Sequence, residues 1–511
     1  MLCAFGQSAR AWENAGFGLA HRGPDGRSRR SLGDCYMEFH RTQRDGPQPF
    51  ETPRSMCMFK MHIDNKAELF SGSAKYKSVH EPLISTLETR GMVALAAGVE
   101  GDFAMCYTTG DQLMVARDRF GVQPLFYMRM PNGAVVFASE AKAFGPGCDA
   151  VATFPPGHVY DSVTDRFVCY EPNYWSQVGP CLARAEVSDF AAMMGAAFTE
   201  AVRRCTDKKT AYMLSGGLDS SLVVAEAVKL HGAKNVHTYS IGMADSPDCD
   251  AARRVAKHFG TVHTEVRFDV AHGLKVLPDV IRSIESYDTE TVRSAVPMWI
   301  LAEHVFKTKK HKLAVTADGA DEIFGGFVNF RSAPSVNACV SECARQLGLI
   351  GQFSVLRAER CCAAHGGEVR FPFLNGGVVG AAMCGAVRDL KLNPDTEKWL
   401  LRQSFAAAAA VGSLPENILW RERLGMADGV GDEWVDALKA HAVETVTDET
   451  LFGVQLAAKG HNIPVTHEEA LYRTIFGGMF SSPGIISEIW RPLWSNAQID
   501  PSGRYLKLSR V

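Results

Sequence analysis

The sequence predicts an α/β and α+β protein with two unlike domains, and three observations carry that prediction. Up to about Tyr174 the chain consists of short apolar stretches broken by Gly, Pro and Asp, which is typical of stacked antiparallel sheets flanked by helices. From about Asp189 onward, helical stretches alternate with short apolar strands, which indicates a parallel sheet. A Gly-Gly turn at residues 216–217 joins one such strand to a helix and so marks the expected ligand-binding edge.

Composition places the chain among ordinary globular proteins. Its 511 residues suffice for about two or three domains. A net charge of -3 gives no general attraction to nucleic acid or acidic membranes. No apolar run approaches the roughly 18 residues of a membrane-spanning helix. The fourteen cysteines include no CxxC pair and follow no secretory leader, so we expect free thiols and a cytoplasmic protein.

Three stretches of the first domain carry the clearest strand signals. Residues 36–40, 112–116 and 134–138 are apolar-rich and end at turn residues. They predict strands of the stacked sheets.

The glycine turn of the second domain has the features of a phosphate-binding loop. The apolar strand 211–213 enters it and the helix 222–227 leaves it. Its glycines admit an anion, Ser215 and Ser220 add hydroxyl donors, and the helix N-terminus adds free N–H groups. Asp219 stands where the usual nucleotide loop has Lys, so a metal ion is expected to meet the phosphates. A plain Ser/Gly turn is the alternative interpretation.

Two further strands should end at the same edge of the sheet. They are residues 237–243 and 312–315, and the second runs into the acidic stretch 316–326. Carboxylates near a phosphate site repel it unless a divalent cation intervenes, so Asp219 and Asp321 are the expected Mg²⁺ contacts. Alternatively, the acidic residues only stabilise the N-terminus of a helix.

Motifs along most of the chain resemble those of the asparagine synthetases. In the first domain they are HRGPD (21–25), ARDRFGVQPL (116–125), FASEAK (137–142) and PPGH (155–158). In the second they are SIGM (240–243), ESYDTETVR (285–293), EVRFPFL (368–374), EKWLLR (397–402), ILWRER (418–423) and DGVG (428–431). The resemblance implies an N-terminal Ntn-hydrolase-like αββα sandwich of the class II amidotransferase type at 1–180. It also implies a PP-loop ATP-pyrophosphatase-type (adenine nucleotide alpha hydrolase-like) domain at 189–511.

The resemblance also implies a reaction and a site. Aspartate and ATP would form β-aspartyl-AMP and pyrophosphate, and ammonia would then give asparagine and AMP. The implied ATP-binding residues are Leu214, Ser215, Gly216, Gly217, Asp219, Ser220, Ile241, Gly242, Thr316, Ala317 and Gly319. The implied catalytic residues are Asp318, Arg423 and Arg293. Asp318 replaces the family's Glu and Arg423 its Lys, whereas Arg293 is either a substrate clamp or a packed stem with a solvated head.

The first domain departs from the family where glutamine would be hydrolysed. The family's nucleophilic Cys follows the initiator Met directly, whereas Leu2 here precedes Cys3. Lys60 and Met61 replace the family's Asn-Gly, and Val79-His80-Glu81 replaces its Asp-Gly-Glu. Arg41, which could grip the glutamine carboxylate, is retained. We therefore interpret Cys3 as a core residue, and leave glutaminase activity open.

The resulting hypothesis is an asparagine synthetase-like ligase that uses ATP, Mg²⁺ and mainly free ammonia. The alternatives are a glutamine-dependent synthetase, an adenylating cyclase of the β-lactam synthetase kind, and an inactive nucleotide-binding scaffold. Expected partners are the small-molecule substrates, with no nucleic acid or membrane, and a homodimer or larger assembly stays open. Residues 440–511 are irregular in sequence, and Trp490 and Trp494 are expected to pack the last helical segments onto the second domain.

Overall fold

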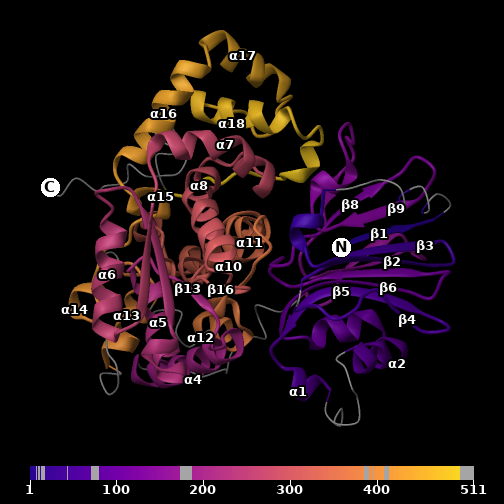
Figure 1. Cartoon of the computed structure of the whole chain (residues 1–511), viewed down its shortest axis with the longest axis horizontal. Coiled ribbons are helices and arrows are strands. Elements are labelled where there is room, and N and C mark those ends of the chain that lie inside the picture. The colour runs from indigo at the N-terminus through magenta and orange to yellow at the C-terminus, as the bar shows by residue number, and fades with distance from the viewer. Residues whose placement is uncertain are drawn as a thin grey trace. The chain divides into compact units, whose positions relative to one another are not determined.

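The chain folds into two compact units, which Figure 1 draws in full. One unit comprises Met1–Tyr174 and Met479–Ser487, and the other comprises Trp175–Gly478 and Glu488–Val511. The computed structural model describes all residues except 7, 8, 10, 11, 13–17, 43, 71–79, 173–186, 385–390, 394, 408–413 and 495–511.

Two six-stranded antiparallel sheets form the first unit. The first sheet has the order β10-β8-β9-β1-β3-β2 and the second β12-β11-β7-β6-β5-β4. The strands are β1 (Leu2–Phe5), β2 (Gly26–Leu32), β3 (Cys35–Arg41), β4 (Phe50–Glu51), β5 (Met56–Ile63), β6 (Gly101–Thr108), β7 (Leu113–Arg117), β8 (Phe126–Arg129), β9 (Val135–Ala138), β10 (Ala152–Thr153), β11 (His158–Asp161) and β12 (Arg166–Cys169). The strands expected at 36–40, 112–116 and 134–138 are confirmed as β3, β7 and β9.

The core of this unit has two layers. Alternate residues of strands from both sheets, such as Met37, Met58 and Phe137, form a cluster between the sheets. Helix α2 (His80–Gly98) packs its apolar side chains on residues of β5 and β6 in a second cluster. The short helix α1 (Lys66–Leu69) follows β5.

A segment from late in the sequence belongs to the first unit. Ser482 Oγ donates to the Val151 carbonyl at 2.6 Å, and Thr153 Oγ1 donates to the Ile485 carbonyl at 3.0 Å. Gly484 packs so closely that a Cβ there would lie 2.7 Å from Val151 O. The domain boundaries predicted from the sequence place every residue after 189 in the second domain, because no local pattern marks this return.

The second unit is built on a five-stranded parallel sheet. Its order is β15-β14-β13-β16-β17, so the order reverses between β13 and β16. Ligands of such sheets bind beyond the carboxyl ends of the strands at this reversal. The strands are β13 (Ala211–Met213), β14 (His237–Gly242), β15 (Val262–Arg267), β16 (Leu313–Val315) and β17 (Glu368–Arg370). The predicted strands are confirmed as β13, β14 and β16, whereas β15 and β17 were not predicted.

Helices surround this sheet (Figure 1). They are α4 (Val187–Cys205), α5 (Leu218–His231), α6 (Pro247–Phe259), α7 (Val270–Ile284), α8 (Thr289–Glu303), α9 (Ala320–Phe324), α10 (Val336–Leu349), α11 (Ser354–Ala363), α12 (Gly376–Met383), α13 (Trp399–Ala407), α14 (Glu416–Leu419), α15 (Met426–Gly429), α16 (Glu433–Thr445), α17 (Asp448–Ala457) and α18 (His467–Gly477). None of the described helices is long and apolar enough to cross a membrane.

The stretch of irregular sequence after residue 440 is largely helical up to residue 477. Helices α16, α17 and α18 occupy most of this stretch. Thr466 and Glu469 form a reciprocal capping box at the start of α18, a spacing that the sequence already displays. Trp490 packs against Phe327 with ring centroids 5.0 Å apart, as expected for the tail.

Candidate active site

The loop between β13 and α5 forms an open cradle at the reversal of strand order. Leu214 N donates to Tyr239 O at 2.8 Å, which ties the loop to β14. Ser215 Oγ accepts from Gly217 N at 3.2 Å and lies 3.1 Å from Ser220 Oγ. Gly217 caps α5, so the free N–H groups of the helix start face the same space.

Gly216 is the residue that makes the cradle possible. Its φ of 73° lies in the left-handed region, where a side chain is strained. A Cβ there would lie 2.3 Å from Ala252 N and 2.4 Å from Ala251 C, both backbone atoms of α6. The loop therefore rests directly on the next helix.

Two carboxylates at the carboxyl ends of β13 and β16 share one ammonium group. Lys398 Nζ binds Asp219 and lies 2.6 Å from Asp321 Oδ1. Arg423 holds both oxygens of Asp321 at 3.0 Å. Burial opposes ionisation of Asp321, but Arg423 and Lys398 together hold the pKa of its carboxyl well below the ordinary value. This cluster places two cations, Lys398 and Arg423, beside the cradle, where the two carboxylates balance their charge.

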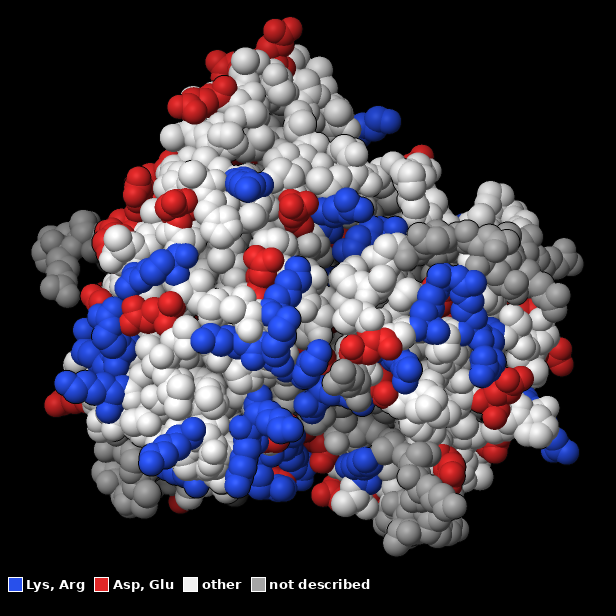
Figure 2. Space-filling model, viewed as in Figure 1, with Lys and Arg blue, Asp and Glu red and all other residues white. Residues whose placement is uncertain are grey.

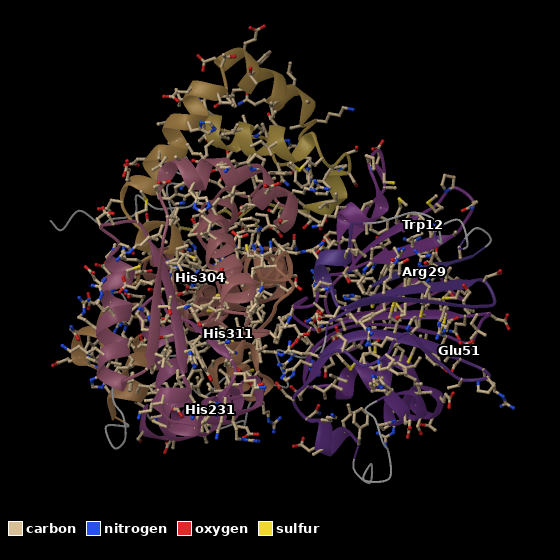
Figure 3. The ribbon with its side chains drawn as sticks, viewed as in Figure 1. Trp12, Arg29, Glu51, His231, His304 and His311 are labelled. Atoms are coloured by element: carbon tan, nitrogen blue, oxygen red, sulfur yellow. The ribbon has the colours of Figure 1, made fainter. Side chains whose placement is uncertain are left out.

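A second ion pair lies on the side of β14. Arg421 Nη2 donates to Asp248 Oδ1 at 2.7 Å. Burial raises the pKa of Asp248 to about 6, against the attraction of Arg421. Tyr239 lines the same wall. Its hydroxyl group is hydrogen-bonded to Nε2 of His311, which Figure 3 labels, at 2.8 Å.

The inner wall combines one ion pair with aromatic side chains. Arg357 Nη2 donates to Asp318 Oδ1 at 2.5 Å. Phe327 and Trp490 pack against each other, and the Arg423 guanidinium lies 4.7 Å from the Phe327 ring centroid. Such a wall excludes water from the reacting groups.

Two further carboxyl groups lie here without a cation. Ser294 Oγ donates to Glu290 Oε1 at 3.1 Å, and Ser354 Oγ donates to Glu322 Oε1 at 2.8 Å. Burial raises the pKa of each carboxyl to about 7.

These groups line one cavity of about 210 Å³. Both charge signs are interspersed over much of the visible surface in Figure 2, and the cavity wall likewise carries both, with Arg357, Lys398, Arg402, Arg421 and Arg423 beside its carboxylates. The sequence-predicted residues on its wall are Leu214, Ser215, Gly217, Asp219, Ser220, Ile241, Thr316, Ala317, Asp318, Gly319, Asp321 and Arg423. Gly216 and Gly242 instead support the wall from behind: a Cβ on Gly242 would lie 2.3 Å from Ser246 Cβ.

Arg293 does not line the cavity. It is 1% exposed, and its guanidinium forms two hydrogen bonds to Glu468 of α18, at 2.8 and 2.6 Å. Neither interpretation from the sequence describes this arrangement, since the head is neither solvated nor directed at a ligand. The ion pair instead joins α8 to α18.

Replacing Arg293 by methionine is expected to lower the free energy of unfolding by about 3–5 kcal/mol, because the buried Glu468 loses its cation. The double variant R293M/E468M should recover part of that loss. Denaturant unfolding of the two single variants and the double variant measures the effect. A large rise in the KM for ATP with unchanged stability would contradict this structural role.

No role is predicted from the sequence for Lys398, Arg357, Arg421 or Glu290. Lys398 lay within a recognised motif, but nothing in local spacing links it to carboxylates far away in the sequence. Its partners become visible only when the sheet brings the ends of β13 and β16 together.

In the first unit the thiol of Cys3 points into the core between the sheets. Cys3 is fully buried in that cluster, 3.8 Å from Cys35 Sγ. Burial raises its pKa well above the ordinary value, which opposes formation of a nucleophilic thiolate. Leu2 lies on the opposite face of β1, where it pairs with Glu38 of β3.

The other predicted glutamine-site positions lie on β3, β5 and α2. Arg41 is exposed at the end of β3. Lys60 Nζ is held by Asp45 Oδ1 at 3.0 Å. His80 stacks on Phe50 with ring centroids 3.4 Å apart, and burial lowers its pKa to about 4. Val79 lies outside the described residues.

A parallel sheet with a glycine cradle and a charged cavity, in one chain with an antiparallel sandwich, agrees with the class that the family models give: an ATP-dependent carbon–nitrogen ligase with an amidotransferase-type first domain. The asparagine synthase family model matches residues 194–348 and 340–501, and the glutamine amidotransferase domain model matches residues 5–177. The chain belongs to the asparagine synthetase family. The first unit thus has the Ntn-hydrolase-like fold and the second the PP-loop fold, as predicted, and ATP is a substrate.

Curated relatives cover nearly the whole chain. A probable glutamine-hydrolyzing asparagine synthetase of Dictyostelium discoideum is 33% identical, with 96% of this chain and 94% of that protein covered. The glutamine-hydrolyzing asparagine synthetase of Asparagus officinalis is also 33% identical, with 95% of this chain and 88% of that protein covered.

Proposed function

We propose that this protein makes asparagine from aspartate, ATP and free ammonia. The side-chain carboxylate of aspartate attacks the α-phosphate of ATP, which gives β-aspartyl-AMP and pyrophosphate. Ammonia then displaces AMP. One observation carries the choice of nitrogen source: the only cysteine near the start of the described chain, Cys3, lies in the closed core of the sandwich.

The cavity residues have distinct tasks in this proposal. The cradle N–H groups and the hydroxyls of Ser215 and Ser220 bind phosphate oxygens. Lys398 and Arg423 offset the charge that develops on the departing pyrophosphate. The aromatic inner wall keeps water from the mixed anhydride.

The residues present fit one Mg²⁺ ion. Asp219 Oδ1 is buried and accepts no hydrogen bond, and Asp219 and Asp321 already share a cation in Lys398. Among the described residues these two carboxylates have no third His, Cys, Asp or Glu ligand beside them, so waters and phosphate oxygens would complete the coordination. When bound, Mg²⁺ supplies positive charge to the phosphates.

Glutamine-dependent synthesis is the second candidate, and the relatives favour it. Both relatives named above are glutamine-hydrolyzing, and the amidotransferase model matches the first unit. Against it stands the register of β1, which turns the Cys3 thiol away from the face of Leu2 and Glu38.

Purified protein with ATP, Mg²⁺ and aspartate tests the nitrogen source. We expect asparagine, AMP and pyrophosphate with ammonium, and no glutamate from glutamine. The variant Cys3→Ala should keep the ammonium-dependent rate, because the thiol is only a core side chain. Asparagine, AMP and glutamate are quantified for both proteins.

Glutamate release that disappears in Cys3→Ala would establish the glutamine-dependent candidate instead. Absence of turnover with either nitrogen source would favour the inactive scaffold.

A further inference from the structure

Free ammonia poses a chemical problem that a glutaminase domain normally avoids. In neutral solution the donor is ammonium, which has no lone pair and cannot attack a carbonyl carbon. At neutral pH a site that binds the small cation and accepts its proton next to the mixed anhydride makes this abundant form of the donor reactive.

Glu290 is placed for this task. It lies in the first turn of α8, lines the cavity and remains partly open to it. A Cβ built on Gly425 would lie 3.9 Å from both Glu290 Oε1 and Arg423 Nη1, so Glu290 lies near the phosphate-binding cations. In the proposed reaction the carbonyl carbon is bonded through oxygen to the α-phosphate, so we place it in this part of the cavity.

Glu290 also differs from the other carboxylates of the wall in its partners. Lys398 holds Asp219 and Asp321, Arg421 holds Asp248 and Arg357 holds Asp318. Glu290 receives only the Ser294 hydroxyl, and among the described residues it forms no ion pair. Glu322 also lacks a cation, but it is only 4% exposed and so faces the cavity less. Asp288 and Glu422 also form no ion pair among the described residues, but Asp288 is only 1% exposed and Glu422 lies at the exposed rim. Glu290 is therefore the accessible carboxylate of the inner wall that no cation holds.

The charged groups around Glu290 come from three helices and the loop between α14 and α15. Burial is the largest influence on its pKa and raises it to about 7. Asp428 of α15 raises it further, whereas Arg293 of α8, Arg357 of α11 and Arg423 lower it. A carboxyl that titrates near neutral pH can both bind a cation and accept a proton.

We infer that Glu290 is the ammonium-binding residue and general base of the amide-forming step, an inference that rests on the proposed use of free ammonia. An N–H bond of ammonium breaks as its proton moves to the Glu290 carboxylate. The freed electron pair forms the C–N bond to the β-carbonyl carbon, and the C–O bond to AMP breaks with its pair leaving on the phosphate. The second proton of the nitrogen passes to a phosphate oxygen of the departing AMP.

The variant Glu290→Gln tests this role, because the amide keeps the shape and loses the charge. We expect kcat/KM for ammonium to fall at least about 100-fold, the usual contribution of a general base. Aspartate-dependent exchange of pyrophosphate into ATP should persist. Hydroxylamine, a neutral nucleophile at pH 7, should still form aspartyl hydroxamate at nearly the wild-type rate. Residual ammonium activity should rise with pH in proportion to the free-base fraction.

The matched control is Glu422→Gln, an exposed acid at the rim of the same cavity, which should behave like the wild type. Equal loss of ammonium and hydroxylamine turnover, or loss of exchange, would overturn the inference in favour of a structural role. Unchanged ammonium kinetics in Glu290→Gln would also overturn it while leaving the proposed function intact. Failure of the wild-type protein to use ammonium would refute both.

Discussion

Replacing Gly216 by alanine is expected to abolish ATP-dependent asparagine formation. The left-handed φ costs an L-residue about 1–2 kcal/mol, and the new Cβ would meet the α6 backbone at 2.3 and 2.4 Å. Backbone atoms of a packed helix cannot move aside as a flexible side chain can, so the loop must shift. Its N–H groups then no longer converge on the phosphate oxygens. Pyrophosphate release should therefore fall by at least about 10²–10³-fold, as when preorganised donors are lost.

Gly217→Ala is the matched control one residue along the chain. Its φ of -73° suits any residue, and the nearest contact of its Cβ would be Ser215 Oγ at 3.3 Å. A hydroxyl can rotate away, so this variant should keep most of its activity. An equal loss of activity in Gly216→Ala and Gly217→Ala would contradict this explanation. It would show that the loop needs both glycines because a side chain at either position blocks the phosphate, and not because of the backbone conformation of Gly216. Circular dichroism confirms that each variant is folded.

Asp321→Asn is expected to lower pyrophosphate release about as much as Gly216→Ala does, and also to lower the free energy of unfolding. It removes one of the two carboxylates proposed for Mg²⁺ and leaves the buried Lys398 and Arg423 with an excess of positive charge. Breaking such a buried pair costs about 3–5 kcal/mol. Pyrophosphate release measured across a Mg²⁺ titration should show a large loss that higher Mg²⁺ only partly restores.

Asp250→Asn provides the comparison for Asp321→Asn. Asp250 is an exposed residue of α6, and its ion pair with Arg253 lies at the surface. Surface pairs contribute little, so this variant should match the wild type in melting temperature and in Mg²⁺ dependence. Normal turnover of Asp321→Asn at low Mg²⁺ would remove Asp321 from the proposed metal site.

Much of the site could be predicted because its signals are local. The strand, the two glycines and the helix start occupy consecutive residues, so their geometry follows from backbone preferences at neighbouring positions. Asp321 was predicted in the same way, since it follows a recognisable strand whose end must meet the sheet edge. The capping box of α18 was equally local, but the irregular composition around it obscured the helix.

The sequence by itself determined the two fold classes, the glycine cradle and the acidic residues beside it, because these depend on short-range periodicity and turn chemistry. Only the tertiary structure decided which charged residues form ion pairs with one another. Lys398 reaches Asp219 and Asp321, and Arg293 is bound to Glu468 instead of a ligand, because sheet order and helix packing bring distant segments together. The tertiary structure also determined on which face of β1 Cys3 lies, because the pairing of β1 with β3 and β9 sets which alternate side chains enter the core.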